Sequence, residues 1–126
     1  MKPVTWEDIS VERISNSVQR RVLWGDQGTF AQLTLASSTH VAKHRHSAEQ
    51  FTCIIKGAIR LNVDGQDVLL KAGEMLVIPA NVEHEAWVVE DCVVWDFFTE
   101  RRDDWQEGIN QYLDSDRPAV QLSTGP

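Results

Sequence analysis

The sequence predicts an all-β fold of the sandwich or barrel class. Two observations carry this prediction. Runs rich in β-branched, aromatic and aliphatic residues recur about every ten residues between Ser17 and Phe98, a spacing typical of antiparallel sandwiches and barrels. Turn signals separate these runs, and the strongest is the dipeptide Asp64-Gly65, which favours a tight hairpin.

Eight or nine short strands follow from this pattern. The first is expected where Val18, Arg20 and Val22 alternate with Gln19 and Arg21, because a period of two is typical of a strand. The later runs are bounded in the same way by polar or glycine-containing turns. Strands are expected at residues 17–24, 30–35, around His44, and at 51–56, 59–63, 68–70, 75–78, 85–89 and 93–98.

A short C-terminal helix is expected after the last strand. Thr99 can cap this helix, which would continue to Leu113. One face of the helix would carry Trp105, Ile109 and Tyr112. The sequence therefore predicts a β-fold with a short helical addition.

The length of 126 residues indicates one domain with a core of its own. No internal repeat divides the chain. The expected organisation is an N-terminal arm at residues 1–16, a β-barrel domain at 17–99, and a helix and tail at 100–126.

Composition excludes several classes of partner. The net charge is −7 and the pI is about 4.9, whereas nucleic acid and anionic membranes attract clustered Lys and Arg. No apolar run approaches the roughly 20 residues that span a bilayer, and the N-terminal residues lack the apolar stretch of a signal peptide. Cys53 and Cys92 lie in apolar runs and are expected to be buried, reduced thiols. We therefore expect a cytoplasmic protein with neither nucleic acid nor a membrane as partner.

Three histidines and a glutamine form a candidate metal site. His44 and His46 are two residues apart, so in a strand they would lie on one face, about 6.6 Å apart along the backbone. Gln50 follows four residues later, and His84 lies beyond a turn framed by glycine and proline. Three imidazoles and one amide oxygen can coordinate a divalent transition metal.

The fourth predicted metal ligand, the side-chain amide of Gln50, affects the chemistry that we expect. Three neutral imidazoles and the neutral Gln50 leave the double charge of the ion uncompensated, so the ion would be a strong Lewis acid toward anionic oxygen. This favours redox-neutral reactions, such as isomerisation, tautomerisation or elimination, over iron-dependent dioxygenation. Glu49 is an alternative ligand, although alternation along a strand places it on the face opposite Gln50.

A second polar cluster lies at the end of the last strand. Asp96 and Phe98 share a strand face, and Arg102 follows on the next segment. If that face is the inner one, Asp96 can act as an acid or a base, and Arg102 can bind a carboxylate with its bidentate fork. The alternative is that Asp96 only ends the strand, while Arg102 forms a surface ion pair with Asp103 or Glu100.

The metal motif resembles the two motifs of the cupin family. The first cupin motif contains two histidines, an acidic or amide ligand and a glycine, matched here by His44, His46, Gln50 and Gly57. The second contains a glycine, a proline and a histidine, matched here by Gly73, Pro79 and His84. Asn81 stands where the family usually has glycine, and asparagine also adopts positive φ in turns. The resemblance implies a cupin double-stranded β-helix, or jelly roll.

Among cupins, the chain resembles the small pectin-degradation type known as KdgF. That type has Asp-x-Phe-Thr-x-x-Arg at the end of the last strand, matched here from Asp96 to Arg102, and an early Trp-Glu-Asp, matched at residues 6–8. Its activity is the ketonisation of 4,5-unsaturated uronates from pectin or alginate breakdown, at a metal held by three histidines and a glutamine. The resemblance implies that the metal and Arg102 hold the sugar acid beside Phe98, and that Asp96 moves the proton.

Two other functions are compatible with the sequence: an Fe(II)-dependent dioxygenase on a small substrate, and a non-catalytic sugar-acid-binding cupin. One divalent ion is expected, either Zn, Ni, Fe or Mn, because imidazole binds several transition metals. The expected partners are a small anionic sugar and a second copy of the chain, since pairing of copies covers the edge strands that a small jelly roll leaves.

Overall fold

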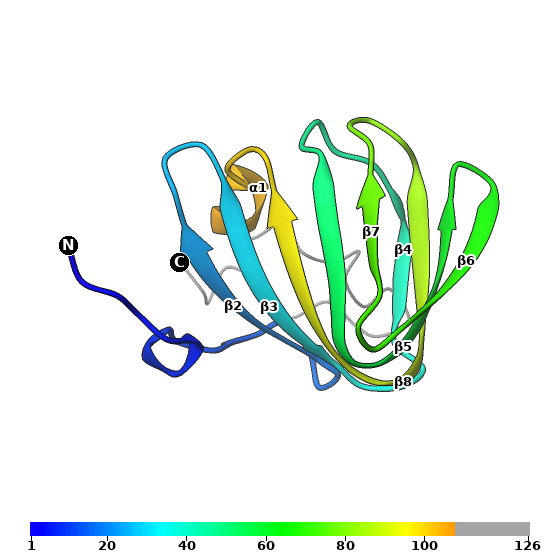
Figure 1. Cartoon of the computed structure of the whole chain (residues 1–126), viewed down its shortest axis with the longest axis horizontal. Helices are drawn as coiled ribbons and strands as arrows, with labels where there is room; N and C mark the ends of the chain where they lie inside the picture. The colour runs from blue at the N-terminus through cyan, green and yellow to red at the C-terminus, as the bar shows by residue number, and fades with distance from the viewer. Residues whose placement is uncertain (108–126) are drawn as a thin grey trace.

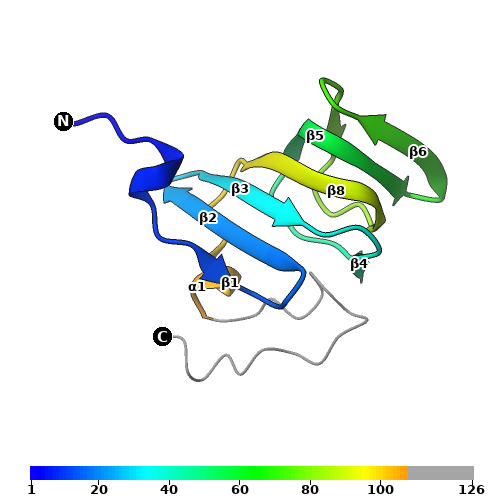
Figure 2. The same ribbon diagram turned by 90° about the horizontal axis from the view of Figure 1, so that it is seen from below.

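The structure, a computed structural model, describes residues 1–107 and shows the all-β jelly roll that the sequence predicts. In chain order its elements are η1 (Trp6–Asp8), β1 (Glu12–Arg13), β2 (Val18–Trp24), β3 (Thr29–Leu35), β4 (His40–His44), β5 (Gln50–Val63), β6 (Gln66–Lys71), β7 (Met75–Ile78), β8 (His84–Phe98) and α1 (Asp103–Gln106). The strands form one antiparallel sheet in the order β1-β2-β3-β8-β5-β6, with β4 paired to β8 and β7 paired to β5. The sheet curls into an open bowl (Figure 1), and the view from below follows this strand order (Figure 2).

Two long strands, β5 and β8, organise the sheet. The sequence predicts four short strands in their place, at residues 51–56, 59–63, 85–89 and 93–98. The short runs fuse because β5 bends at Gly57 without leaving the sheet. Gly57 has a φ of 88°, and a Cβ there would clash with the carbonyl oxygen of Asp91. The pairing with β8 shifts register around this bend and then continues.

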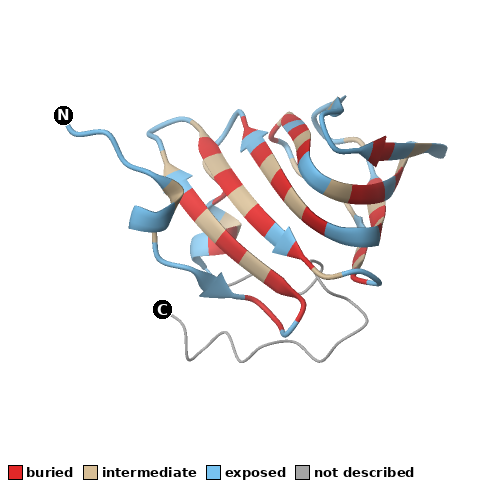
Figure 3. Cartoon of the chain, turned by 60° about the horizontal axis from the view of Figure 1, so that its bottom comes forward, coloured by how far each residue is buried: buried red, intermediate tan, exposed pale blue. Residues whose placement is uncertain are grey.

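Alternate residues of the strands are buried, which produces the stripes of Figure 3. The buried apolar side chains form one core cluster on the inner side of the bowl. In β2, Val18 and Val22 belong to this core, whereas the equally buried Arg20 between them interrupts the apolar pattern. A buried charged side chain needs a specific explanation.

Two of the predicted turns adopt left-handed backbone conformations. Asp64 and Gly65 join β5 to β6 with φ values of 50° and 82°, which confirms the predicted hairpin. Asn81 has a φ of 63°, so asparagine does serve where cupins usually have glycine. The backbone N–H of Asn81 also donates to the carbonyl of His46 at 2.8 Å, which ties this turn to the predicted metal site.

The N-terminal arm packs against the outer face of the sheet. Trp6 of η1 contacts Phe30 and Trp95, with ring centres 5.1 and 6.0 Å apart. Further along, β1 extends the sheet by pairing with Gln19 and Arg20 of β2. The arm is therefore joined to the body by both aromatic contacts and strand pairing.

The described helix is short, and the prediction that Thr99 caps it is wrong. α1 begins at Asp103, and its N-cap residue is Arg102. Thr99 is occupied elsewhere: its hydroxyl accepts the Glu49 N–H at 3.0 Å, and its own N–H donates to the Glu49 carbonyl at 3.1 Å. The rest of the predicted helix, with Ile109, Tyr112 and Leu113, lies outside the described residues.

Two further predictions concern the cysteines and membrane-spanning segments. Both cysteines are free thiols as predicted, although only Cys92 is buried and Cys53 is half-buried. Among residues 1–107, no helix is long and apolar enough to cross a membrane.

Candidate functional site

The structure brings His44, His46 and His84 together. His44 ends β4 and lies opposite His84, the first residue of β8. The ring centres of these two histidines are 4.3 Å apart, and those of His46 and His84 are 5.0 Å apart. One nitrogen of each ring lies within 4.8 Å of the other two, a spacing compatible with three ligands of one ion.

His46 reaches this group from a loop. The prediction that His44 and His46 share one face of a strand is wrong, because β4 ends at His44. The loop is instead fixed by the bond from Asn81 to the His46 carbonyl. The His46 ring also packs edge-on against Phe98, with ring centres 5.5 Å apart.

One contact recurs in all three histidines, because each Nδ1 lies against the backbone carbonyl oxygen of a residue two positions away. The distances are 2.7 Å from His44 to Ala42, 2.9 Å from His46 to Ala48 and 2.9 Å from His84 to Val82. A carbonyl oxygen only accepts, so each Nδ1 carries the proton and each Nε2 keeps its lone pair. The Nε2 of His84 is buried without a hydrogen-bond partner among the described residues. Such nitrogens are suited to bind a metal ion.

Burial keeps these rings neutral. It lowers the pKa of His44 to about 3, and the nearby His84 adds to this effect. It also lowers the pKa of His46 and of His84. The positive charge of Arg102 acts in the same direction on all three rings. Neutral imidazoles are the form that binds metal, so the donor set fits a divalent transition metal.

Gln50 completes the group. Its side-chain oxygen lies 3.1 Å from Nε2 of His46, and both atoms are acceptors in the tautomer described above. Two facing lone pairs repel each other unless a cation attracts both, so this contact also fits a metal. Glu49 is absent from the group of converging ligand atoms, and its backbone is bonded to Thr99. Gln50 rather than Glu49 therefore lies beside the histidines.

A hydrogen-bonded chain connects Gln50 to Asp96. The Gln50 amide donates to the Thr52 hydroxyl at 2.8 Å, and Thr52 donates to the Asp96 carboxylate at 2.7 Å. The chain turns the oxygen of Gln50 toward the histidines. Burial raises the pKa of Asp96 to about 6, against the opposing effects of Thr52, Gln50 and Arg102. Asp96 is thus a buried carboxyl group able to exchange a proton near neutral pH.

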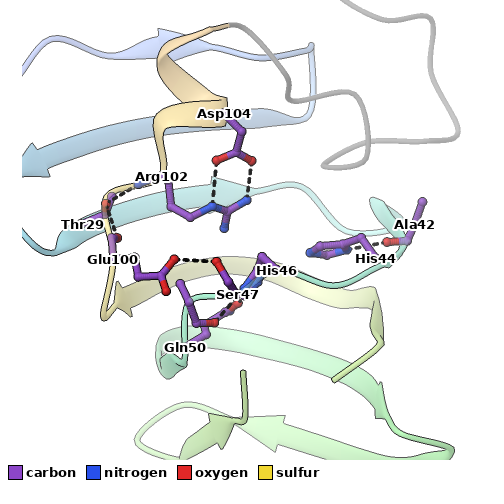
Figure 4. A network of polar contacts seen from close by, with 10 residues as sticks. Thr29, Ala42, His44, His46, Ser47, Gln50, Glu100, Arg102 and Asp104 are labelled. Carbon is purple, nitrogen blue, oxygen red and sulfur yellow. Dashed lines mark hydrogen bonds and ion pairs between the residues drawn. The ribbon is translucent and has the colours of Figure 1, made fainter. Parts of the chain in front are cut away.

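Arg102 is held by an ion pair and by two aromatic rings. Its Nε and Nη2 donate to the two carboxylate oxygens of Asp104, at 3.0 and 2.8 Å (Figure 4). The central carbon of its guanidinium lies 4.7 Å from the ring centre of Phe98 and 4.6 Å from that of Trp105. These contacts define the plane of the guanidinium.

The alternative surface role of Asp96 and Arg102 is not what the structure shows. Asp96 is 9% exposed and Arg102 is 5% exposed. Asp103 pairs with Arg101, and Glu100 accepts a hydrogen bond from a serine hydroxyl. The carboxylate that pairs with Arg102 is that of Asp104.

The polar groups line one end of a pocket that continues into the apolar core. Its cavity volume is about 60 Å³. Its polar lining comes from His44, Gln50, Thr52, His84, Asp96 and Arg102. Two aromatic rings, Phe98 and Trp105, and several aliphatic side chains complete the wall. This arrangement can bind an anionic group beside a metal and exclude water from the inner end.

Sequence reasoning overlooks two residues of this site. Thr52 carries the hydrogen bonds between Gln50 and Asp96, and its position two residues after Gln50 on the same strand is a signal that could have identified it. Asp104 orients Arg102, but nothing in the sequence distinguishes it from the adjacent Asp103.

Residues 32–97, about half of the chain, match the family model described as "Cupin domain". This chain belongs to the cupin family. The matched segment runs from within β3 to the last but one residue of β8 and includes all four residues of the candidate metal site. No curated protein matches this cupin at a significant level.

Solved structures of other cupins share the fold. An RmlC-like cupin from Shewanella frigidimarina is 23% identical, with a TM-score of 0.76 over 81% of this chain and 93% of that one. KdgF from a Halomonas species is 22% identical, with a TM-score of 0.73 over 79% and 94% of the two chains. A variant of oxalate decarboxylase from Bacillus subtilis is 14% identical, with a TM-score of 0.67 over 77% and 29%. At these identities the likeness shows the fold alone.

Proposed function

We propose that this cupin is a metal-dependent enzyme that ketonises 4,5-unsaturated uronates derived from pectin or alginate. One observation carries the proposal: a buried carboxyl group, Asp96, and a buried guanidinium, Arg102, line the same pocket as His44 and His84. The sequence resemblance to KdgF-type cupins from Asp96 to Arg102 and the fold shared with KdgF support the choice of substrate.

The reaction needs one proton removed from oxygen and one delivered to carbon. In the cyclic sugar the oxygen on C5 is the ring oxygen, so the anomeric O–H loses its proton while the bond between the anomeric carbon and the ring oxygen breaks, and the anomeric carbon becomes an aldehyde. The C5–O bond becomes a carbonyl and the electron pair of the C=C bond takes a proton at C4, so no oxidant is consumed. Asp96 delivers that proton, because it is the buried acid of the pocket. Arg102 binds the substrate carboxylate. A divalent ion held by His44, His46, His84 and Gln50 would supply Lewis acidity toward the substrate oxygens.

The cavity itself is small. Its volume of about 60 Å³ is below the range of small-molecule sites, so it admits a carboxylate with its adjoining carbons but not a whole sugar ring. The rest of the sugar would lie at the open end of the pocket.

The test is turnover of unsaturated galacturonate by protein loaded separately with Zn, Ni, Fe(II) or Mn. We expect loss of the conjugated C=C absorbance without oxygen uptake, and a keto product by NMR. Oxygen uptake by the iron-loaded protein would instead identify a dioxygenase. Binding of the uronate without turnover under any metal would identify a sugar-acid-binding protein.

A further inference from the structure

Two buried arginines contact one indole beside the pocket. The guanidinium carbon of Arg20 in β2 lies 4.1 Å from the ring centre of Trp105 in α1, and that of Arg102 lies 4.6 Å from it. The ring of Trp105 also meets Phe98 edge-on, with centres 5.1 Å apart. Trp105 is 4% exposed, so its position is set by these neighbours.

The burial of Arg20 is costly. Its side chain is fully buried, whereas the side chain of Glu12, an ion-pair partner at 3.2 Å, is 47% exposed. Burying this cation costs its hydration, and apolar residues of similar size are often as stabilising as a buried ion pair or more so. The neighbours of Arg20 on the same strand face, Val18 and Val22, are apolar core residues. A second cation on the same ring, Arg102, adds repulsion.

These contacts form a continuous connection from the N-terminal arm to the pocket. Glu12 in β1 binds Arg20 through both carboxylate oxygens, Arg20 packs on Trp105, and Trp105 packs on Arg102. Arg102 then lines the pocket. An arginine binds a carboxylate through two parallel hydrogen bonds only when its plane is correctly oriented, and small displacements of such groups are costly to binding.

We propose that Arg20 and Trp105 are positioning residues that hold the Arg102 guanidinium in the plane that receives a substrate carboxylate. The proposal rests on the proposed function in one respect, namely that Arg102 binds a carboxylate. Neither Arg20 nor Trp105 is required to touch the reacting atoms.

The first measurement is calorimetric binding of galacturonate, a stable uronic acid, to the zinc-loaded full-length protein. We expect Trp105→Ala to weaken binding by about tenfold, because it removes the stacked ring, and Trp105→Phe to stay within about threefold of the wild type. Arg20→Met should weaken binding by about threefold while its Tm equals or exceeds that of the wild type. A purely structural role of Arg20 predicts the reverse, a lower Tm with unchanged affinity.

Trp87→Ala is the matched control. Trp87 also carries a stacked arginine, since the guanidinium carbon of Arg60 lies 4.4 Å from its ring centre, but neither residue lines the pocket. We expect Trp87→Ala to leave galacturonate affinity unchanged. An equal loss of affinity in Trp87→Ala and Trp105→Ala would overturn the proposal, because the effect would then be a general one.

The second measurement needs no ligand. NMR relaxation of the arginine Nε–H groups should show the Arg102 side chain rigid in the wild type and mobile in Trp105→Ala, with Trp105→Phe close to the wild type. If Arg102 stays rigid in Trp105→Ala, the positioning role is wrong. If the wild type does not bind galacturonate but Arg102 loses rigidity as expected, the substrate class is wrong and the positioning role stands.

Discussion

The contact between each histidine Nδ1 and a backbone carbonyl decides what the three rings can do. It places every proton on Nδ1 and directs the Nε2 lone pairs to a common point. The carbonyls belong to the segments that carry the histidines, so the backbone that positions each ring also selects its tautomer. Replacing a histidine therefore removes a ligand without disturbing the tautomers of the other two.

We expect one divalent ion per chain, and its loss in the double variant His46→Ala/His84→Ala. Metal analysis after dialysis of the zinc-loaded protein measures this. His40→Ala is the control, because His40 is bonded to Glu85 at 2.6 Å and stacks on Trp87 outside the convergent group. Full metal content in the double variant would contradict the assignment.

Asp96→Asn should retain the metal and lose turnover of the unsaturated uronate by about 10²–10⁴-fold, the usual contribution of a general acid. The amide oxygen can still accept the hydrogen bond from Thr52, so the chain to Gln50 and the fold should persist. Steady-state kinetics and metal analysis test the two parts. A near-normal kcat would show that another group, with Glu49 or a water molecule as the next candidates, delivers the proton.

Arg102→Ala should raise KM more than it lowers kcat, because a carboxylate is bound about equally in the ground and transition states. The expected rise in KM is about 10–100-fold, as for the loss of hydrogen bonds to a charged group. The same kinetic assay separates the two parameters. A selective loss of kcat with unchanged KM would mean that Arg102 acts on the transition state instead.

At the scale of elements, the bend of β5 at Gly57 allows one strand to serve both halves of the bowl. Gly57→Ala should destabilise the protein by about 3 kcal/mol or more, since it combines an unfavourable φ with a backbone clash. Gly73→Ala is the matched control: its φ is 89°, but a Cβ meets nothing within 4 Å, so it should cost about 1 kcal/mol. The free energy of unfolding of both variants is measured by urea denaturation. An equal decrease in the two variants would show that the clash with Asp91 relaxes freely.

The sequence predicts the β-runs, the hairpin and the ligand spacing, because these depend on neighbours in the chain. It does not predict that four runs fuse into β5 and β8, since that depends on which strands pair across the bend. The same limit explains the wrong cap at Thr99, whose hydrogen-bonding groups are taken by Glu49, 50 residues away. The sequence shows that Arg20 is a charged residue between Val18 and Val22 on one strand face. Its contact with Trp105 depends on the tertiary fold.

At the scale of the whole molecule, the outer face of the sheet carries an uncharged apolar row that crosses several strands. Pairing places Val77, Phe51, Phe97, Phe30 and Leu23 side by side. Phe51 and Phe97, with ring centres 6.1 Å apart, are 44% and 42% exposed. In a chain of net charge −7, an uncharged row is where two copies can meet with least repulsion.

We propose that the protein is a homodimer formed through this row. Sedimentation should give twice the 14.3 kDa of one chain, and Phe97→Glu should give monomers because it buries a charge at the contact. Leu69→Glu, at an exposed position of β6 outside the row, should leave the dimer intact. A wild-type monomer at micromolar concentration would exclude the dimer.

The central claim is that the pocket itself delivers a proton to carbon, and ketonisation in D₂O tests it most directly. The product of the metal-loaded protein is followed by NMR during the first turnovers. It should carry one deuteron, added to a single face of the C=C carbon that receives the proton. Asp96 lies on one side of the pocket, so only one face can receive it. Equal deuteration of both faces would show that the enol tautomerises in solution, outside the protein, and would contradict the account.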